Sequence, residues 1–313
     1  MAIAGVFPGQ GSQSVGMMDG LAESYAIVKT IFQEASDILS RDLWAMASEG
    51  PEAELNNTEN TQPAMLAAGV ATWRVWQEQG GCLPVGMAGH SLGEYSALVA
   101  AGKLAFADAV ALVAERARLM QAAVPAGEGA MAAILGLDDA DVIAVCEQAA
   151  DENTVVEAVN FNSIGQVVIA GNTSGIDKAI EIAKEAGAKR AIKLAVSVPS
   201  HCALMKPAAE QLAEKLSATA FSASDMPVLH NVDVKDHQSD EEIRTALSQQ
   251  LYQAVRWVDT VNTLRDEFAA DKLVEFGPGK VLFGLNRRID RKMKAICVTD
   301  AASLDKALAF CEE

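Results

Sequence analysis

Basic residues are scarce in this chain, which has 25 lysines and arginines against 42 aspartates and glutamates and a formal net charge of −17. Proteins that bind nucleic acid offer the phosphate backbone a positive surface, so this composition excludes general nucleic-acid binding. The few basic residues still gather in two groups, Arg287, Arg288, Arg291, Lys292 and Lys294, and Lys189, Arg190 and Lys193. Each group is either a solvated face of mixed charge or a docking surface for an anionic partner.

Long hydrophobic runs and a signal peptide are also missing. The most apolar stretch, residues 95–114, is interrupted by Lys103 and Asp108 and is therefore unsuited to crossing a membrane. The residues before Pro8 contain no basic segment of the kind that opens a secretory signal. We expect a cytoplasmic protein that does not contact a membrane.

The five cysteines are few, odd in number and without C-x-x-C spacing. This pattern predicts reduced thiols rather than a disulfide framework or a zinc site.

The sequence motifs that bind common cofactors are incomplete or missing. Gly9-Gln10-Gly11 follows a predicted strand, but Ser14 stands where a dinucleotide fingerprint needs its third glycine. With no Walker A and no H-E-x-x-H sequence, we expect neither a cofactor nor a metal.

What the chain does contain is the G-x-S-x-G sequence of residues 89–93, between an apolar run at 84–88 and an apolar stretch at 94–100. At a strand-to-helix junction this sequence predicts a nucleophile elbow. The two glycines allow strand and helix to approach closely. Ser91 then stands at the N-terminus of the helix, where backbone N–H groups can stabilise an oxyanion. The alternative is an ordinary turn with an exposed serine.

Strands and helices alternate along both ends of the chain, which predicts an α/β fold with a largely parallel, hydrolase-like sheet. The middle has a different order. Strands are expected at 131–137, 155–160, 166–171 and 189–196, with helices at 138–150 and 173–186. This β-α-β-β-α-β order is ferredoxin-like. We therefore expect a core formed by residues 1–124 and 199–313, with an inserted ferredoxin-like subdomain at 125–198.

A serine nucleophile requires a general base, and the chain offers only four histidines. His90 is expected to point away from the nucleophile's side of the elbow, and His237 lies in a polar loop. His201 and His230 remain. We favour His201 because it follows the return of the subdomain to the core, but His230 follows a predicted strand and stays an alternative.

Arg116 is the second feature with chemical content. It lies on the apolar stripe of the helix predicted at 108–123, three and four residues after Val113 and Leu112. A buried guanidinium remains ionised and requires an anion. That anion is either a protein carboxylate or the carboxylate of a substrate, which the planar guanidinium matches with two hydrogen bonds. Beside a nucleophilic serine, a carboxylate-bearing acyl substrate is the sharper hypothesis.

Together these features resemble the malonyl-CoA:acyl-carrier-protein transacylases of fatty acid synthesis, over essentially the whole chain. The similarity is carried, in family order, by residues 8–13, 89–95, 196–201, 231–233, 250–252 and 275–280. It is greater to the bacterial stand-alone enzyme than to a polyketide synthase module. One departure is Ala254, where the family often has proline.

The resemblance implies a role for each matching position. Ser91 is the nucleophile, His201 its base, and the backbone carbonyl of Gln250 orients the histidine. Backbone N–H groups of Gln10 and Leu92 form the oxyanion hole.

For the substrate, the resemblance implies that Arg116 binds the malonyl carboxylate and that Gln62 belongs to the active site. The implied reaction is ping-pong transfer from malonyl-CoA, through a malonyl-serine ester, to the phosphopantetheine thiol of acyl carrier protein. Because acyl carrier proteins are acidic, the two basic groups become candidate docking surfaces. We expect a monomer.

Two other functions remain possible. A serine esterase or thioesterase of the α/β-hydrolase type shares the elbow, but its histidine should lie near the end of the chain, whereas the last histidine here is His237. A carrier-protein-binding scaffold without activity is the non-enzymatic alternative, and the presence of Ser91, His201 and Arg116 argues against it.

Overall fold

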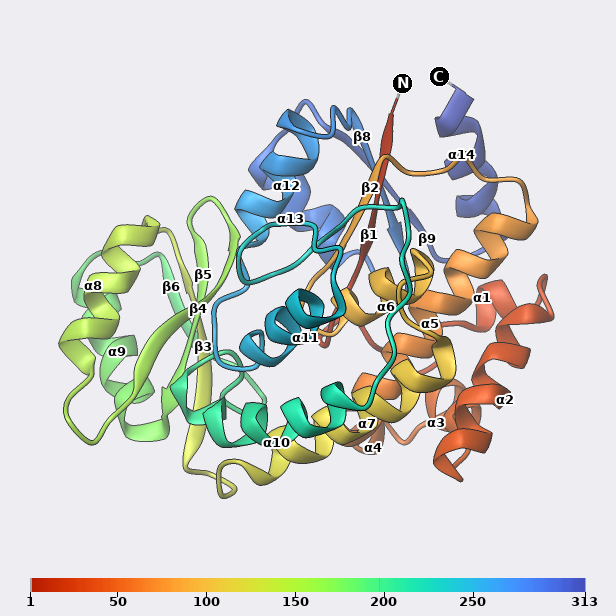
Figure 1. Ribbon diagram of the computed structural model, residues 1–313. Coiled ribbons are helices and arrows are strands. Elements are labelled where there is room, and N and C mark those ends of the chain that lie inside the picture. The colour runs from red at the N-terminus through yellow and green to blue at the C-terminus, as the bar shows by residue number, and fades with distance from the viewer. Residues whose placement is uncertain (1, 197, 313) are drawn as a thin grey trace.

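The computed structural model describes residues 2–196 and 198–312, so Ser197 of the 196–201 motif lies outside the described residues (Figure 1). Its larger sheet has five strands in the order β7-β2-β1-β8-β9, and every pairing is parallel. The strands are β1 (Ile3–Phe7), β2 (Gly86–Gly89), β7 (Val228–Leu229), β8 (Lys272–Phe276) and β9 (Lys294–Val298). The predicted α/β core with a parallel sheet is confirmed.

Helices cover both faces of this sheet, as a parallel sheet requires. Alternate side chains of β1 enter different cores: Ile3 and Phe7 join one apolar cluster, and Ala4 and Val6 join the other. The first cluster is covered by α2 (Ile27–Leu39), α5 (Thr58–Glu78), α6 (Gly93–Ala100), α7 (Phe106–Ala122), α10 (Lys206–Ser217), α11 (Asp240–Gln249) and α14 (Ala301–Glu312). The second is covered by α12 (Trp257–Asp266) and α13 (Val281–Ile289). Four short helices complete this part: α1 (Asp19–Ala22), α3 (Leu43–Glu49), α4 (Glu52–Leu55) and the 3-10 turn η1 (Ala203–Met205).

The middle of the chain forms a second, antiparallel sheet in the order β4-β5-β3-β6, at the left of Figure 1. Its strands are β3 (Gly129–Leu135), β4 (Val156–Ser163), β5 (Gln166–Asn172) and β6 (Arg190–Lys193). The helices α8 (Asp139–Ala149) and α9 (Thr173–Glu185) pack on one face around a separate apolar cluster. The chain order β3-α8-β4-β5-α9-β6 is the predicted ferredoxin-like order.

The structure differs from two of the sequence-based expectations. The strand predicted at 228–232 stops at Leu229, because the chain turns there: the amide of His230 donates to the carbonyl of Lys235, and the amide of Val234 donates to the carbonyl of His230. The prediction that all cysteines are reduced is wrong in this structure. Cys82 forms a disulfide with Cys311 of α14, and their sequence separation of 229 leaves no local spacing that could reveal it. Cys146, Cys202 and Cys297 are free and buried.

No helix among the described residues is both long and apolar enough to span a membrane.

The contact between β2 and α6 leaves no room for a side chain at Gly89. A Cβ atom added there would lie 1.8 Å from the backbone carbon of Gly93. We expect Gly89→Ala to lower the free energy of unfolding by about 3 kcal/mol or more, since the elbow must open. Gly284, inside α13, has nothing within 4 Å of an added Cβ. Gly284→Ala is the matched control and should raise stability by roughly 0.5–1 kcal/mol. Urea unfolding measures both, and equal effects would contradict the steric account.

Candidate active site

Ser91 lies at the turn between β2 and α6, with a backbone φ of 51°. A non-glycine residue in the left-handed region is uncommon and is concentrated at functional turns. The turn brings the Ser91 hydroxyl to 2.8 Å from Nε2 of His201, a residue 110 positions later in the chain. The predicted elbow and its favoured base are therefore brought together.

His201 is buried and is held in one orientation. Its φ is 68°, and its amide donates to the carbonyl of Leu251. Nδ1 lies 2.6 Å from the backbone carbonyl of Gln250. Because a carbonyl oxygen only accepts, the ring proton lies on Nδ1, and Nε2 is left to accept from the Ser91 hydroxyl. Burial, with a further contribution from the Arg116 guanidinium, lowers the pKa of His201 to about 3.

Arg116 of α7 is buried, and its guanidinium points at the elbow. One terminal nitrogen donates to Oε1 of Gln62 at 2.5 Å. The other donates to Oε1 of Gln250 at 2.9 Å and to the Ser91 hydroxyl at 3.2 Å. All three partners are neutral oxygens. Among the described residues no carboxylate bonds directly to this guanidinium, so of the two anions that the sequence allowed, a bound substrate carboxylate fits this arrangement.

The turn after β1 is pressed against the elbow. A Cβ atom on Gly9 would lie 2.4 Å from the carbonyl oxygen of His90 and 3.7 Å from the amide nitrogen of Leu92. This close approach requires glycine. It places Gln10 and Leu92, the two expected oxyanion-hole residues, on the wall of the same cavity as Ser91.

That cavity, of about 270 Å³, lies between the core and the small sheet. The core contributes Ser91, Arg116 and His201, and the small sheet contributes Asn162 and Val168. Much of the remaining lining is apolar and includes Met120, Met131, Leu194, Val198, Leu282 and Leu285. The cavity therefore offers a nucleophile, a cation and an apolar wall to a thioester that carries a carboxylate at one end.

The other histidines are bound elsewhere. Nε2 of His90 lies 2.7 Å from Oδ1 of Asn162, and the residue contributes to the cavity wall without bonding to Ser91. His237 bonds to Asp233, and His230 is buried against Glu94. Of the two histidines that the sequence left open as the base, His201 lies beside Ser91, whereas His230 lies against Glu94.

Two asparagines were missed as members of the site. Oδ1 of Asn231 accepts from the Ser91 amide at 2.7 Å, and its Nδ2 donates to the carbonyl of Gly89 at 2.7 Å. Asn162 holds His90 from the small sheet. Asn231 belongs to the 231–233 motif, which was a usable signal, but a motif alone does not reveal a contact 140 residues away in the chain.

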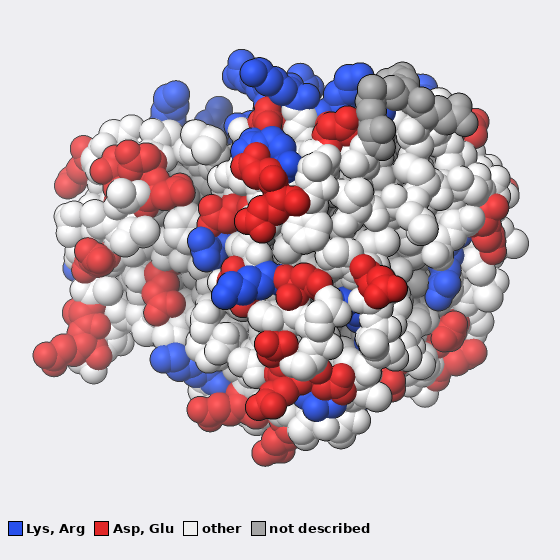
Figure 2. Space-filling model, turned by 45° about the horizontal axis from the view of Figure 1, so that its top comes forward, with Lys and Arg blue, Asp and Glu red and all other residues white. Residues whose placement is uncertain are grey.

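The candidate docking residues are all exposed: Arg287, Arg288, Arg291, Lys292, Lys189 and Arg190. Arg288, in the last turn of α13, donates to Oε1 of Gln166, which lines the cavity. On the face drawn in Figure 2, acidic side chains are spread widely, and the most conspicuous group of basic side chains lies along the upper edge.

In the part of the chain that the structure describes, no group of three or more histidine, cysteine, aspartate or glutamate side chains is arranged to hold a metal ion.

The site combines a serine at a nucleophile elbow, a histidine oriented by a backbone carbonyl and a buried arginine. This combination is typical of an acyltransferase. Residues 5–283 match the acyl transferase domain family, and the chain belongs to that family. It is 55% identical over 303 residues to the malonyl CoA-acyl carrier protein transacylase of Escherichia coli K12, with 97% of each chain covered. It is 45% identical over 311 residues to the Bacillus subtilis 168 protein of the same name, covering 99% of this chain and 98% of that protein.

Solved structures give the same result. The fold is similar to a malonyl CoA-acyl carrier protein transacylase from Coxiella burnetii, with a TM-score of 0.98, 46% identity and coverage of 100% and 98% of the two chains. It is also similar to a malonyl-transacylase solved in complex with a type II PKS acyl-carrier protein, with a TM-score of 0.97, 54% identity and coverage of 99% and 100%. The family resemblance drawn from the motifs is confirmed.

The lowered pKa of His201 has a consequence for pH dependence. A histidine whose pKa is about 3 stays neutral, and so able to accept a proton, well below the ordinary value of 6.5. We expect kcat/KM for acylation of Ser91 by an acyl thioester to show no acid limb near pH 6.5. Circular dichroism at each pH controls for unfolding. A limb with its midpoint near 6.5 would show that His201 titrates as it does in water.

Proposed function

We propose that this chain transfers a malonyl group from malonyl-CoA to the phosphopantetheine thiol of acyl carrier protein, in fatty acid synthesis, through an ester on Ser91. The observation that carries the proposal is the buried guanidinium of Arg116, 3.2 Å from the Ser91 hydroxyl, whose hydrogen-bond partners among the described residues are all neutral oxygens. A malonyl group offers that guanidinium a directly bonded anion, with the thioester carbonyl next to the nucleophile.

In the first half-reaction, Ser91 Oγ attacks the thioester carbonyl while His201 Nε2 takes its proton. The carbonyl of Gln250 accepts from Nδ1 throughout, so the proton enters a ring that is already oriented. The backbone N–H groups of Gln10 and Leu92 stabilise the tetrahedral oxyanion. Collapse breaks the carbon–sulfur bond, and coenzyme A leaves as a thiol with the proton from His201.

In the second half-reaction, the carrier-protein thiol replaces coenzyme A. His201 takes the thiol proton, the sulfur attacks the malonyl ester, and Ser91 recovers its proton as the ester bond breaks. Arg116, supported by Gln62, holds the malonyl carboxylate in both halves, which fixes the carbonyl over the oxyanion hole.

The same proposal covers the organisation of the chain and the setting of the reaction. Residues 1–124 and 199–313 form the catalytic core, and residues 125–198 form an inserted subdomain that supplies one wall of the cavity. Every step is assigned to side chains and backbone groups of this chain, with no cofactor, and we propose that the reaction takes place in the cytoplasm.

Intact-protein mass spectrometry tests the function directly. Brief mixing with malonyl-CoA should add one malonyl group to Ser91, and phosphopantetheinylated acyl carrier protein should then remove it as malonyl-carrier protein. An adduct that decays to free malonate without transfer would identify a hydrolase. Absence of an adduct with coenzyme A still acylated would identify a non-catalytic carrier-protein scaffold.

Removal of the cation should separate the two acyl groups. Arg116→Met should lower kcat/KM for malonyl-CoA by about 100-fold, because the charged hydrogen bonds to the substrate carboxylate are lost. Loading from acetyl-CoA, which has no carboxylate, should stay close to wild type. Equal losses for the two substrates would mean that Arg116 has only a structural role.

The proposed docking surface can be tested by charge reversal. We propose that the basic side chains at the end of α13 and in the turn after it bind the acidic carrier protein. Arg287→Glu should raise the KM for carrier protein about threefold to tenfold at low salt and leave malonyl loading unchanged. Arg74→Glu, an exposed reversal on α5 outside both basic groups, is the control. Unchanged transfer kinetics in Arg287→Glu would exclude this residue from docking.

A further inference from the structure

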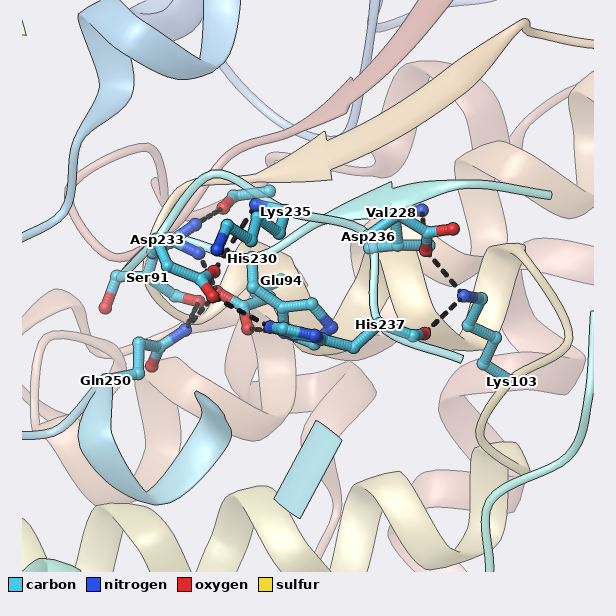
Figure 3. Close-up of polar contacts among 12 residues, drawn as sticks. Ser91, Glu94, Lys103, Val228, His230, Asp233, Lys235, Asp236, His237 and Gln250 are labelled. Carbon is cyan, nitrogen blue, oxygen red and sulfur yellow. Dashed lines mark hydrogen bonds and ion pairs between the residues drawn. The ribbon is translucent and has the colours of Figure 1, made fainter. Parts of the chain in front are cut away.

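A buried carboxylate lies directly beneath the elbow and has no part in the mechanism above. Glu94, in the first turn of α6, is fully buried. Its Oε2 accepts from the amide of Asn231 at 2.9 Å and from Nε2 of Gln250 at 2.8 Å. Its Oε1 lies 2.7 Å from Nδ1 of His230. Figure 3 shows Glu94 between Gln250 and His230, with the Lys103–Asp236 pair to one side.

His230 does not neutralise this carboxylate. A single ring proton on Nδ1 satisfies the hydrogen bond to Glu94. Nε2 is buried and has no partner among the described residues. A second proton there would be a buried donor without an acceptor, which costs the full desolvation of that group. Glu94 and His230 therefore carry one negative charge between them.

The amide of Gln250 connects this negative charge to Arg116. Its Nε2 donates both to Glu94 and to the carbonyl of Ser91, two groups that only accept. This fixes the orientation of the amide, so Oε1 must face Arg116, to which it bonds at 2.9 Å. The amide dipole thus lies with its positive end on the carboxylate and its negative end on the guanidinium. The backbone carbonyl of the same residue holds His201.

Tyr95 is the other acidic group beside the guanidinium, with Arg116 Cζ 5.6 Å from the centre of its ring. Burial raises the pKa of Tyr95, so the phenol stays neutral. Burial also lowers the pKa of Arg116, and the neighbouring Tyr95 and Glu94 oppose that shift. With the phenol neutral, Glu94 is the anion that compensates the buried cation.

We propose that Glu94 is a positioning residue that acts through the amide of Gln250 as the counter-charge of Arg116 while the site is empty. The inference rests on the proposed malonyl transfer. Glu94 offsets the cost of burying the guanidinium charge and keeps the guanidinium aligned on Ser91 before substrate arrives. It also repels the malonyl carboxylate weakly from the far side of Gln250, so the carboxylate binds less tightly than it would to an uncompensated arginine.

Glu94→Gln removes the charge and keeps the shape. Its amide oxygen can accept from Asn231 and Gln250, and its amide nitrogen can donate to Nδ1 of His230. The ring proton of His230 then moves to Nε2, which has no partner among the described residues, and this adds to the loss of stability in the variant. We expect the KM for malonyl-CoA to fall about fivefold, because repulsion between the two carboxylates is lost. The KM for acetyl-CoA should not change. Equal shifts for the two substrates, or no shift in either, would overturn the proposal.

A stability cycle tests the same charge pair without any substrate. Glu94→Gln and Arg116→Met should each lower the melting temperature, because each leaves one buried charge uncompensated. The double variant should melt at a higher temperature than Arg116→Met alone. If Glu94→Gln does not fold by itself, the double variant should still fold. Additive losses would show that the two charges are not coupled.

Lys103→Met is the matched control. The Lys103 ammonium is buried and bonds to Asp236 and to the carbonyl of His237, in the segment that also carries His230, without contacting Gln250. The Lys103→Met variant should have a lower melting temperature than the wild type and an unchanged ratio of malonyl to acetyl KM. Its loss of stability should add to that of Arg116→Met. A change in that ratio as large as the one in Glu94→Gln would reduce Glu94 to a structural role. If wild-type protein takes no malonyl group, the proposed function fails, and the stability cycle remains a separate result.

Discussion

The buried guanidinium of Arg116, beside the nucleophile Ser91, needs hydrogen-bond partners that do not cancel its positive charge. Much of the structure follows from that requirement. Isolated charges are costly to remove from water. Arg116 extends from α7, Gln62 from α5, and Gln250 from the end of α11, so three segments must meet within hydrogen-bond distance of one guanidinium. Because the partners are neutral amides, the charge is held in place and remains available to an anion from solution.

The small sheet contributes in a different way. Its strands carry Met131 and Val168 to one side of the cavity, while α8 and α9 bury its other face. A wall of this kind limits the water that reaches an ester on Ser91. His90 and Asn162 join the wall to the elbow by a single hydrogen bond of 2.7 Å, so the two sheets share one site although each has its own core.

Local patterns predicted the parts of this arrangement that depend on local geometry. The glycines at 89 and 93 indicate the elbow, the order of strands and helices predicted in the middle segment is ferredoxin-like, and the apolar stripe around Arg116 indicates its burial. Contacts between distant segments could not be predicted from the residues alone. The place of His201 after the middle segment favoured it over His230, but the sequence around the two histidines does not show which one meets Ser91. Gln250 orients His201 with its backbone carbonyl, a group that any residue offers, so only the family resemblance identified it. No helix or strand was predicted after residue 276, so β9, α13 and α14 were missed. The strand β7 is shorter than predicted and has only two residues.

The support of His201 by a carbonyl, where many serine enzymes use a carboxylate, bears on which acceptor the ester can meet. A carboxylate would stabilise the protonated imidazole strongly, whereas a neutral carbonyl does so weakly, and burial weakens the base further. The pKa of a thiol is about 8.5, many units below the pKa of water. A weak base therefore activates sulfur far more readily than it activates water, and it acts on the hydroxyl of Ser91 because that group is already held 2.8 Å from Nε2. On the proposed mechanism, the modest basicity of His201 is itself a filter that lets the stored acyl group wait for a thiol.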